Sequence, residues 1–188
     1  MAGTASQRMG ASFEKEIERS FEGYSRGHVA RLDFMPTPVR QIGMRDGVPM
    51  YVRTGKAPFD VYGYRLRDAV MIGAELKANS HPQTSLALVG PEASGSGVQF
   101  HQLDALAGLA QAGGMARLVW DNGGEILVLT SAGIVTAWQA FTQALTSERS
   151  NRTAQPGAKS IKPENFTPVD YTNLNGIIAV DWLLADVK

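Results

Sequence analysis

Two carboxylates and a lysine are spaced so that the acids could hold a divalent metal with the ammonium group beside it. Glu75 stands fifteen positions after Asp60, and Lys77 stands two positions beyond Glu75. Residues 70–74 form an apolar run that predicts a buried strand. Because side chains alternate across a strand, Glu75 and Lys77 should emerge on one face, with Leu76 on the other. Mg²⁺ prefers a few carboxylates, waters and substrate phosphate oxygens, so Asp60 and Glu75 form a candidate Mg²⁺ site. An ion pair at the exposed end of a strand is the alternative interpretation.

Positive charge is concentrated around these residues. The chain has 18 basic and 18 acidic residues, and this balance by itself argues against a nucleic-acid-binding protein. Residues 26–67, however, contain eight basic and three acidic residues, a net charge of +5. A phosphate backbone requires such a local field, and arginine suits bidentate phosphate contacts. The candidate DNA-contacting residues in this span are Arg40, Arg45, Arg53 and Lys56. A solvated arginine-rich surface is the alternative.

The composition excludes several classes of protein. The chain has no cysteine, which excludes disulfides, thiolate catalysis and cysteine-based zinc sites. No run approaches the roughly 20 apolar residues of a membrane span. The N-terminal residues have no apolar segment typical of a signal peptide. We therefore expect no membrane association and a cytoplasmic location, for a gene of cellular or viral origin.

The order of the elements predicts one α/β domain over residues 10–145, with a mixed central sheet flanked by helices. Helices are expected over residues 12–26, 98–112 and 131–145. Strands are expected over residues 28–34, 57–64, 68–77, 115–120 and 125–130.

The remaining segments are expected to connect or extend this domain. Residues 1–9 should form a flexible leader, and residues 78–98 a mobile loop. Asp46-Gly47 predicts the turn of a hairpin over residues 39–53 that projects from the body. Residues 146–188 should form a surface connection followed by a helix, at about 177–184, that docks on the body.

In the order of its motifs, the chain resembles the RecU-type Holliday junction resolvases of the PD-(D/E)xK nuclease superfamily. The resemblance runs from about Gly10 to Trp120. It rests on residues 10–14, Pro36-Thr37-Pro38-Val39, Asp60-x-x-Gly63, Glu75-x-Lys77, Ser85-Leu86-Ala87-Leu88 and His101-Gln102. It implies a restriction-endonuclease-like fold and a homodimer that cuts four-way DNA junctions by paired symmetric nicks, using Mg²⁺ or Mn²⁺.

The chain departs from this family in two ways. Phe59 precedes the first acid, where the family has proline. The segment between Pro38 and Asp60 is shorter than the family's stalk, which enters the centre of the junction. The hairpin at 39–53 would then be a reduced stalk.

The resemblance implies a metal site with a lysine beside it. Asp60, Glu75 and the carbonyl of Leu76 would hold the metal. Lys77 would orient the attacking water or stabilise the transition state.

The resemblance also implies three supporting residues. Gln102 would position Lys77 or a water, and Glu14 would complete the site from the first helix by binding a second metal or a metal-bound water. His101 would contact DNA beside the site. The alternatives are a solvated acid at a helix start for Glu14 and an ordinary polar residue at a helix start for Gln102.

Two other functions remain open at this point. One is a PD-(D/E)xK nuclease of the restriction or repair type that acts on duplex or flapped DNA. The other is a non-catalytic DNA-binding protein with the same fold, although the complete set of Asp60, Glu75, Lys77 and Gln102 argues against it.

Overall fold

The computed structural model describes residues 5–45, 48–53, 55–91, 95–150 and 160–183, and at 5–9, 52–53 and 148–150 it describes the backbone only. The helices are α1 (Ala5–Arg26), α2 (Phe100–Gln111), α3 (Ser131–Ser150) and the short 3₁₀ helix η1 (Pro163–Asn165). The strands are β1 (Ala30–Phe34), β2 (Val39–Arg45), β3 (Val48–Arg53), β4 (Val61–Arg65), β5 (Met71–Asn79), β6 (Leu86–Val89), β7 (Val98–Gln99), β8 (Met115–Asn122), β9 (Ile126–Leu129), β10 (Ser160–Ile161), β11 (Thr167–Val169), β12 (Tyr171–Leu174) and β13 (Ile177–Val180).

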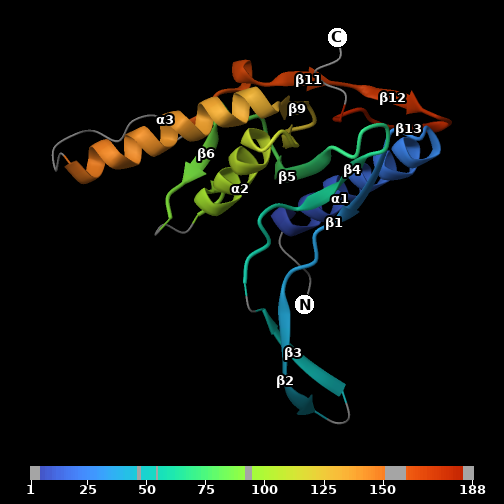
Figure 1. The fold of residues 1–188 in the computed structure, drawn as a ribbon, viewed down its shortest axis with the longest axis horizontal. Coiled ribbons are helices and arrows are strands. Elements are labelled where there is room, and N and C mark those ends of the chain that lie inside the picture. The colour runs from blue at the N-terminus through green and yellow to red at the C-terminus, as the bar shows by residue number, and fades with distance from the viewer. Residues whose placement is uncertain (1–4, 46–47, 54, 92–94, 151–159, 184–188) are drawn as a thin grey trace.

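A six-stranded mixed sheet forms the centre of the described structure (Figure 1). Its strand order is β1-β4-β5-β8-β9-β11. β5 and β8 run parallel, whereas the other neighbours in this sheet are antiparallel. A parallel pair needs a long crossover, and here the crossover contains α2. The predicted α/β fold with a mixed central sheet is confirmed.

The two faces of the sheet have separate hydrophobic cores because side chains alternate along each strand. Ile72, Ala74 and Leu76 of β5 pack in the core beneath α1. On the other face, Leu118 and Trp120 of β8 pack with α2 and α3. The alternate positions of β5, including 75 and 77, therefore face α2.

β2 and β3 form a hairpin that projects from the body (Figure 1). Val39, Ile42, Met44 and Val48 are each more than half exposed, and no described hairpin side chain packs in either core. The predicted projecting hairpin is thus confirmed, although its turn residues, Asp46-Gly47, lie outside the described residues.

The first helix is longer than the sequence analysis predicted. α1 begins at Ala5, so most of the expected leader over residues 1–9 is helical. Gln7, Arg8, Met9 and Ala11 all have high helix propensity, which extends the helix before Ser12.

The segment 78–98, expected to be a mobile loop, contains strands that the sequence analysis did not predict. β5 continues to Asn79, and the segment contains β6 and β7, which form a small sheet with β10. The many glycine, proline and serine residues concealed the short apolar run of β6, whose Leu86 and Leu88 are buried.

The predicted C-terminal helix at 177–184 is wrong. Residues 177–180 form β13, which pairs with β12 in an antiparallel ladder. Ile177 and Ile178 are β-branched, and Asn175-Gly176, both with positive φ, forms the tight turn that a hairpin requires. The segment does dock on the body, since Val180, Trp182 and Leu183 are fully buried. α3 continues to Ser150, which shortens the expected surface connection. No helix in the described ranges is long and apolar enough to cross a membrane.

Candidate active site

β5 carries Glu75 and Lys77 on the face of the sheet that α2 covers. The Glu75 side chain is fully buried, with a relative exposure of 0%. The Nζ atom of Lys77 lies 2.6 Å from its Oε1 atom, and the Lys77 side chain is 21% exposed. The predicted alternation of Glu75, Leu76 and Lys77 is confirmed. The surface ion pair considered as the alternative is excluded, because the carboxylate has no contact with solvent.

Asp60 is held against the edge of β5 where its pairing with β4 ends. The paired register stops at Val61 and Ala74. The N–H of Asp60 donates to the Ala74 carbonyl at 2.9 Å, and the N–H of Leu76 donates to Asp60 Oδ2 at 2.8 Å. The N–H and C=O of a strand residue point to the same side, so the Leu76 carbonyl also faces Asp60. The Asp60 carboxylate is also close enough to Glu75 to act on it electrostatically, so Asp60, Glu75 and Leu76 meet at one position.

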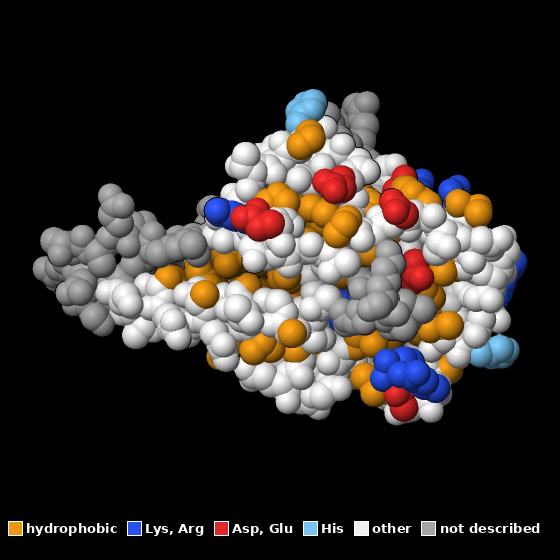
Figure 2. Space-filling model, turned by 90° about the horizontal axis from the view of Figure 1, so that it is seen from above, with side chains coloured by type: hydrophobic (Ala, Val, Ile, Leu, Met, Phe, Trp, Pro, Cys, Tyr) orange, Lys and Arg blue, Asp and Glu red, His pale blue; other side chains and the backbone are white. Residues whose placement is uncertain are grey.

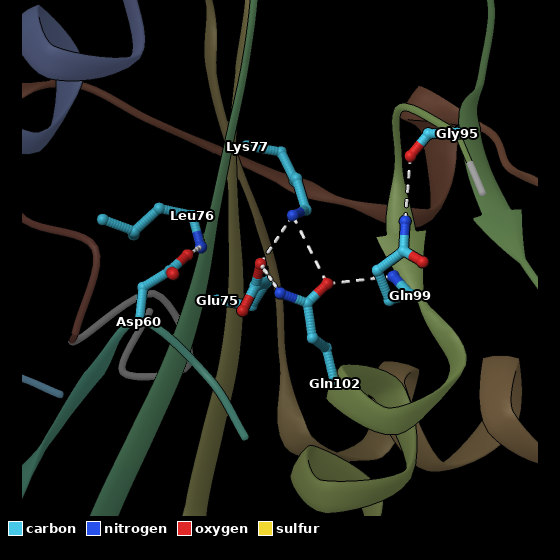
Figure 3. Close-up of polar contacts among 7 residues, drawn as sticks. All are labelled: Asp60, Glu75, Leu76, Lys77, Gly95, Gln99 and Gln102. Carbon is cyan, nitrogen blue, oxygen red and sulfur yellow. Dashed lines mark hydrogen bonds and ion pairs between the residues drawn. The ribbon is translucent and has the colours of Figure 1, made fainter. Parts of the chain in front are cut away.

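Gln102, in the first turn of α2, connects the carboxylate to the lysine (Figure 3). Its Nε2 donates to Glu75 Oε1 at 2.5 Å, and its Oε1 accepts a longer contact of 3.4 Å from Lys77 Nζ. The same Oε1 accepts the backbone N–H of Gln99 at 2.9 Å. The Gln99 side chain is itself held by a hydrogen bond to the Gly95 carbonyl. Gln102 is thus fixed by the helix start and cannot rotate without losing these bonds.

Glu75 is under electrostatic strain that a cation would relieve. Burial raises the pKa of Glu75 to about 8, against the lowering by Lys77, and the nearby Asp60 carboxylate adds to the rise. Glu75 Oε2 is buried and has no hydrogen-bond partner. A buried carboxylate oxygen without a partner is costly. A divalent cation held between Asp60 and Glu75 fits this donor set, because it would satisfy that oxygen and offset the repulsion between the acids.

Glu14 lies near this position without joining a compact ligand cluster. Burial, and to a lesser extent the Asp60 carboxylate, raises the pKa of Glu14. Among the described residues, no three acidic or histidine side chains lie close enough together to form a metal site by themselves. In the described part of the chain, the carboxylates of Asp60 and Glu75 and the Leu76 carbonyl are the groups that this position offers to a metal.

An open cleft of about 470 Å³ lies beside these residues. Its lining is formed by Thr37, Gly55, Lys56, Ala57, Asp60, Gln99, His101 and Gln102. Two of the predicted DNA-contacting residues, Lys56 and His101, line this cleft. The others belong to the hairpin: Arg40 and Arg45 are exposed on β2, and Arg53 ends β3 with its side chain outside the described atoms.

Sequence reasoning missed Gln99, Thr37 and Gly55 as parts of the site. Thr37 lies in one of the segments that carry the resemblance, but no charge or period distinguished it. Gln99 could have been found from its position at the start of a helix that contains Gln102.

Compared with known proteins, the chain matches no protein-family model and no curated protein sequence.

Proposed function

We propose that the chain is a metal-dependent endonuclease that resolves four-way DNA junctions by paired nicks. The observation that carries the proposal is the convergence of Asp60, Glu75 and Lys77 beside an open cleft, with Gln102 bonded to the two β5 side chains. Two acids and an amine held together in this way suit phosphodiester hydrolysis better than they suit stability, because the buried carboxylate lacks a full set of partners.

Each residue has a role that follows from its position. When bound, Mg²⁺ or Mn²⁺ would supply an activated water and neutralise charge on the phosphate. Asp60, Glu75 and the Leu76 carbonyl would bind the metal. The Lys77 ammonium would orient the attacking water or donate to a phosphate oxygen in the transition state. Gln102 would hold Lys77 in place, and Glu14 would accept a hydrogen bond from a water at the edge of the site.

The arrangement of elements is compatible with a restriction-endonuclease-like fold. α1 packs on one face of the mixed sheet, the three antiparallel strands β1, β4 and β5 follow it, and α2 leads to the parallel strand β8. Both carboxylates lie where β4 and β5 separate, at the end of the sheet that opens to the cleft.

The hairpin offers a basic surface for a nucleic-acid strand. Arg40 pairs with Val52, and Arg45 pairs with Val48. Val48 and Val52 are four positions apart on β3 and so share a face. Because cross-strand partners also share a face, both arginines lie on the same face of the hairpin. Figure 2 shows the opposite side of the molecule, where acidic side chains are spread across the face and basic ones lie toward its margins. Nucleic acid would therefore approach from the hairpin side. One site per chain and two nicks per junction imply a homodimer.

The test is cleavage of an immobile four-way junction and of linear duplex with the same arm sequences, each with Mg²⁺ or with EDTA. We expect metal-dependent, paired nicks in the junction only. Asp60→Asn should abolish cutting and leave junction binding largely intact. Equal cutting of both DNAs would indicate a restriction- or repair-type nuclease instead. Binding without cutting under every metal condition would indicate a non-catalytic DNA-binding protein and overturn the proposal.

A further inference from the structure

Both ends of the hairpin return to the catalytic cleft. Thr37 stands two positions before β2, and Gly55 and Lys56 stand two and three positions after the last residue of β3. All three line the cleft together with Asp60. The N–H of Met35 donates to the Asp60 carbonyl at 2.7 Å, which ties the chain entering the hairpin to the start of β4. The position of the hairpin is therefore linked to the position of the metal-binding carboxylate by a few residues.

The start of α2 lies against the second end of the hairpin. The His101 imidazole lies close to the Ala57 carbonyl, one residue after Lys56, and all three residues line the cleft. Burial lowers the pKa of His101, and the ammonium groups of Lys56 and Lys77 lower it further. Both lysines are thus close enough to His101 to act on it electrostatically. His101 is therefore near both cations and, beside Ala57, lies next to the segment that carries Lys56.

Lys56 has the properties of a phosphate-binding residue. It is exposed, it lines the cleft, and no carboxylate among the described residues forms an ion pair with it. Asp60, by contrast, contributes negative charge to the same cleft. A lysine without an acidic partner in such a place favours the backbone of a nucleic-acid strand, because phosphate contacts position a strand without reading its sequence.

We propose that Lys56 binds a phosphate of the cut strand next to the scissile one, while His101 positions Lys56 by holding the root of the hairpin. This inference rests on the proposed nuclease function. It adds a second phosphate subsite and a reason for the hairpin's placement. A junction bound along the hairpin would place its strand on Lys56, and Lys56 would then determine which phosphodiester reaches Asp60 and Lys77.

The test is a binding cycle between protein and DNA, in EDTA so that no cutting occurs. Four-way junctions carrying one uncharged methylphosphonate at each position in turn are bound to the wild type, Lys56→Gln and Lys56→Arg. For the wild type, we expect one position in a strand at which the modification weakens binding by about tenfold. Lys56→Gln should bind the unmodified junction about tenfold more weakly and lose nothing further at that position. Lys56→Arg should restore the wild-type pattern.

Salt dependence provides a readout that a structural role would not change. Removal of one phosphate contact should reduce the slope of log affinity against log salt by about 0.9 for Lys56→Gln. Lys162→Gln is the matched control, since Lys162 is exposed and pairs with Glu164 outside the cleft, and it should leave the slope unchanged. If Lys56→Gln and the methylphosphonate weakened binding additively at every position of the junction, the inference would be overturned. Failure of the nuclease proposal would look different. Cutting would be absent in Mg²⁺, while the coupling between Lys56 and the modified phosphate, measured in EDTA, would stay intact.

His101 is tested by the accuracy of cutting. The wild type should cut at one phosphodiester of the strand. His101→Ala should spread the cuts to neighbouring phosphodiesters, and His101→Gln, which keeps an N–H donor for the Ala57 carbonyl, should restore the single cut. Single-site cutting by His101→Ala would overturn the positioning role.

Discussion

At the scale of single residues, the notable feature is a carboxylate that folding alone would not favour. Glu75 is fully buried, one of its oxygens has no partner, and it lies near a second carboxylate, Asp60. An apolar residue of similar size would pack in such a position at lower cost. The unfavourable free energy of burial is therefore evidence for a function at this position rather than for a role in stability.

The pH dependence of stability should reveal this burial. Glu75 has a pKa of about 8 in the folded protein, above the ordinary 4.5. Below pH 4.5 both states hold the proton, whereas between pH 4.5 and 8 the unfolded state releases it first, so this group lowers the free energy of unfolding as pH rises. Relative to the wild type, Glu75→Gln should gain on the order of 5 kcal/mol across this window. Urea unfolding in EDTA measures the gain, with the exposed Glu18→Gln as control. Parallel curves for wild type and Glu75→Gln would contradict the assignment.

Gln102 should contribute to the rate of cutting more than to binding. Gln102→Ala removes the bonds to Glu75 and Lys77 and releases the lysine from its position. We expect a decrease of roughly 10- to 100-fold in the single-turnover rate, with little change in junction affinity. The measurement is cutting of a labelled junction by excess protein in Mg²⁺. Cutting at the wild-type rate would remove Gln102 from the site.

At the scale of elements, the site depends on the close approach of β4 to β1. Gly63 of β4 pairs with Leu32, and a Cβ atom at Gly63 would lie 2.0 Å from the backbone oxygen of Arg31. The backbone of a paired strand has little room to move. Gly63 therefore keeps β4 in the register that places Asp60 beside Leu76.

Gly63→Ala should destabilise the fold by about 3 kcal/mol, because the added methyl group collides with main chain rather than with a flexible side chain. Gly108→Ala is the matched control. Gly108 is exposed in α2 with no atom within 4 Å of an added Cβ, so alanine there should stabilise the helix by roughly 0.5–1 kcal/mol. Chemical denaturation of both variants measures the two changes. A neutral effect of Gly63→Ala would mean that β1 and β4 do not pair as described.

At the scale of the whole molecule, the C-terminal segment closes the core around α1. Trp182 donates through Nε1 to Ser20 at 2.7 Å. The hydroxyl of Tyr24 donates to Asp181 at 2.8 Å and accepts the N–H of Leu183 at 3.0 Å. These contacts join residues more than 150 positions apart. α1, and with it Glu14, is therefore held in place by the last described residues.

Trp182→Ala should cost about 4 kcal/mol, the usual cost of removing a buried aromatic side chain. Ile178→Ala is the control, because Ile178 is 63% exposed on the neighbouring strand, and its substitution should change stability by less than about 0.5 kcal/mol. Thermal or urea unfolding distinguishes the two. Similar stabilities for both variants would show that the C-terminal segment does not close the core.

The sequence was sufficient to predict an element where the spacing of apolar residues or a turn signal was clear. The helix expected over residues 12–26 lies within α1, where Phe13, Ile17 and Tyr24 are buried at helical spacing. Pairing of residues 39–45 with 48–53 followed from the Asp46-Gly47 signal. The C-terminus was wrongly predicted because an apolar segment of this length fits a helix or a strand, and pairing with β12 decided the outcome.

The candidate site divides in the same way between sequence and tertiary structure. Strand alternation alone determined that Glu75 and Lys77 share a face, because that relation involves only neighbours in the chain. Three features depend on packing between elements far apart in sequence: the distance from Asp60 to Leu76, the contact of Gln102 with both β5 side chains, and the presence of Lys56 and His101 on one cleft. The burial of Glu75, and hence its raised pKa, was likewise decided only when α2 covered the sheet, since desolvation is a property of the folded surroundings and not of the residue.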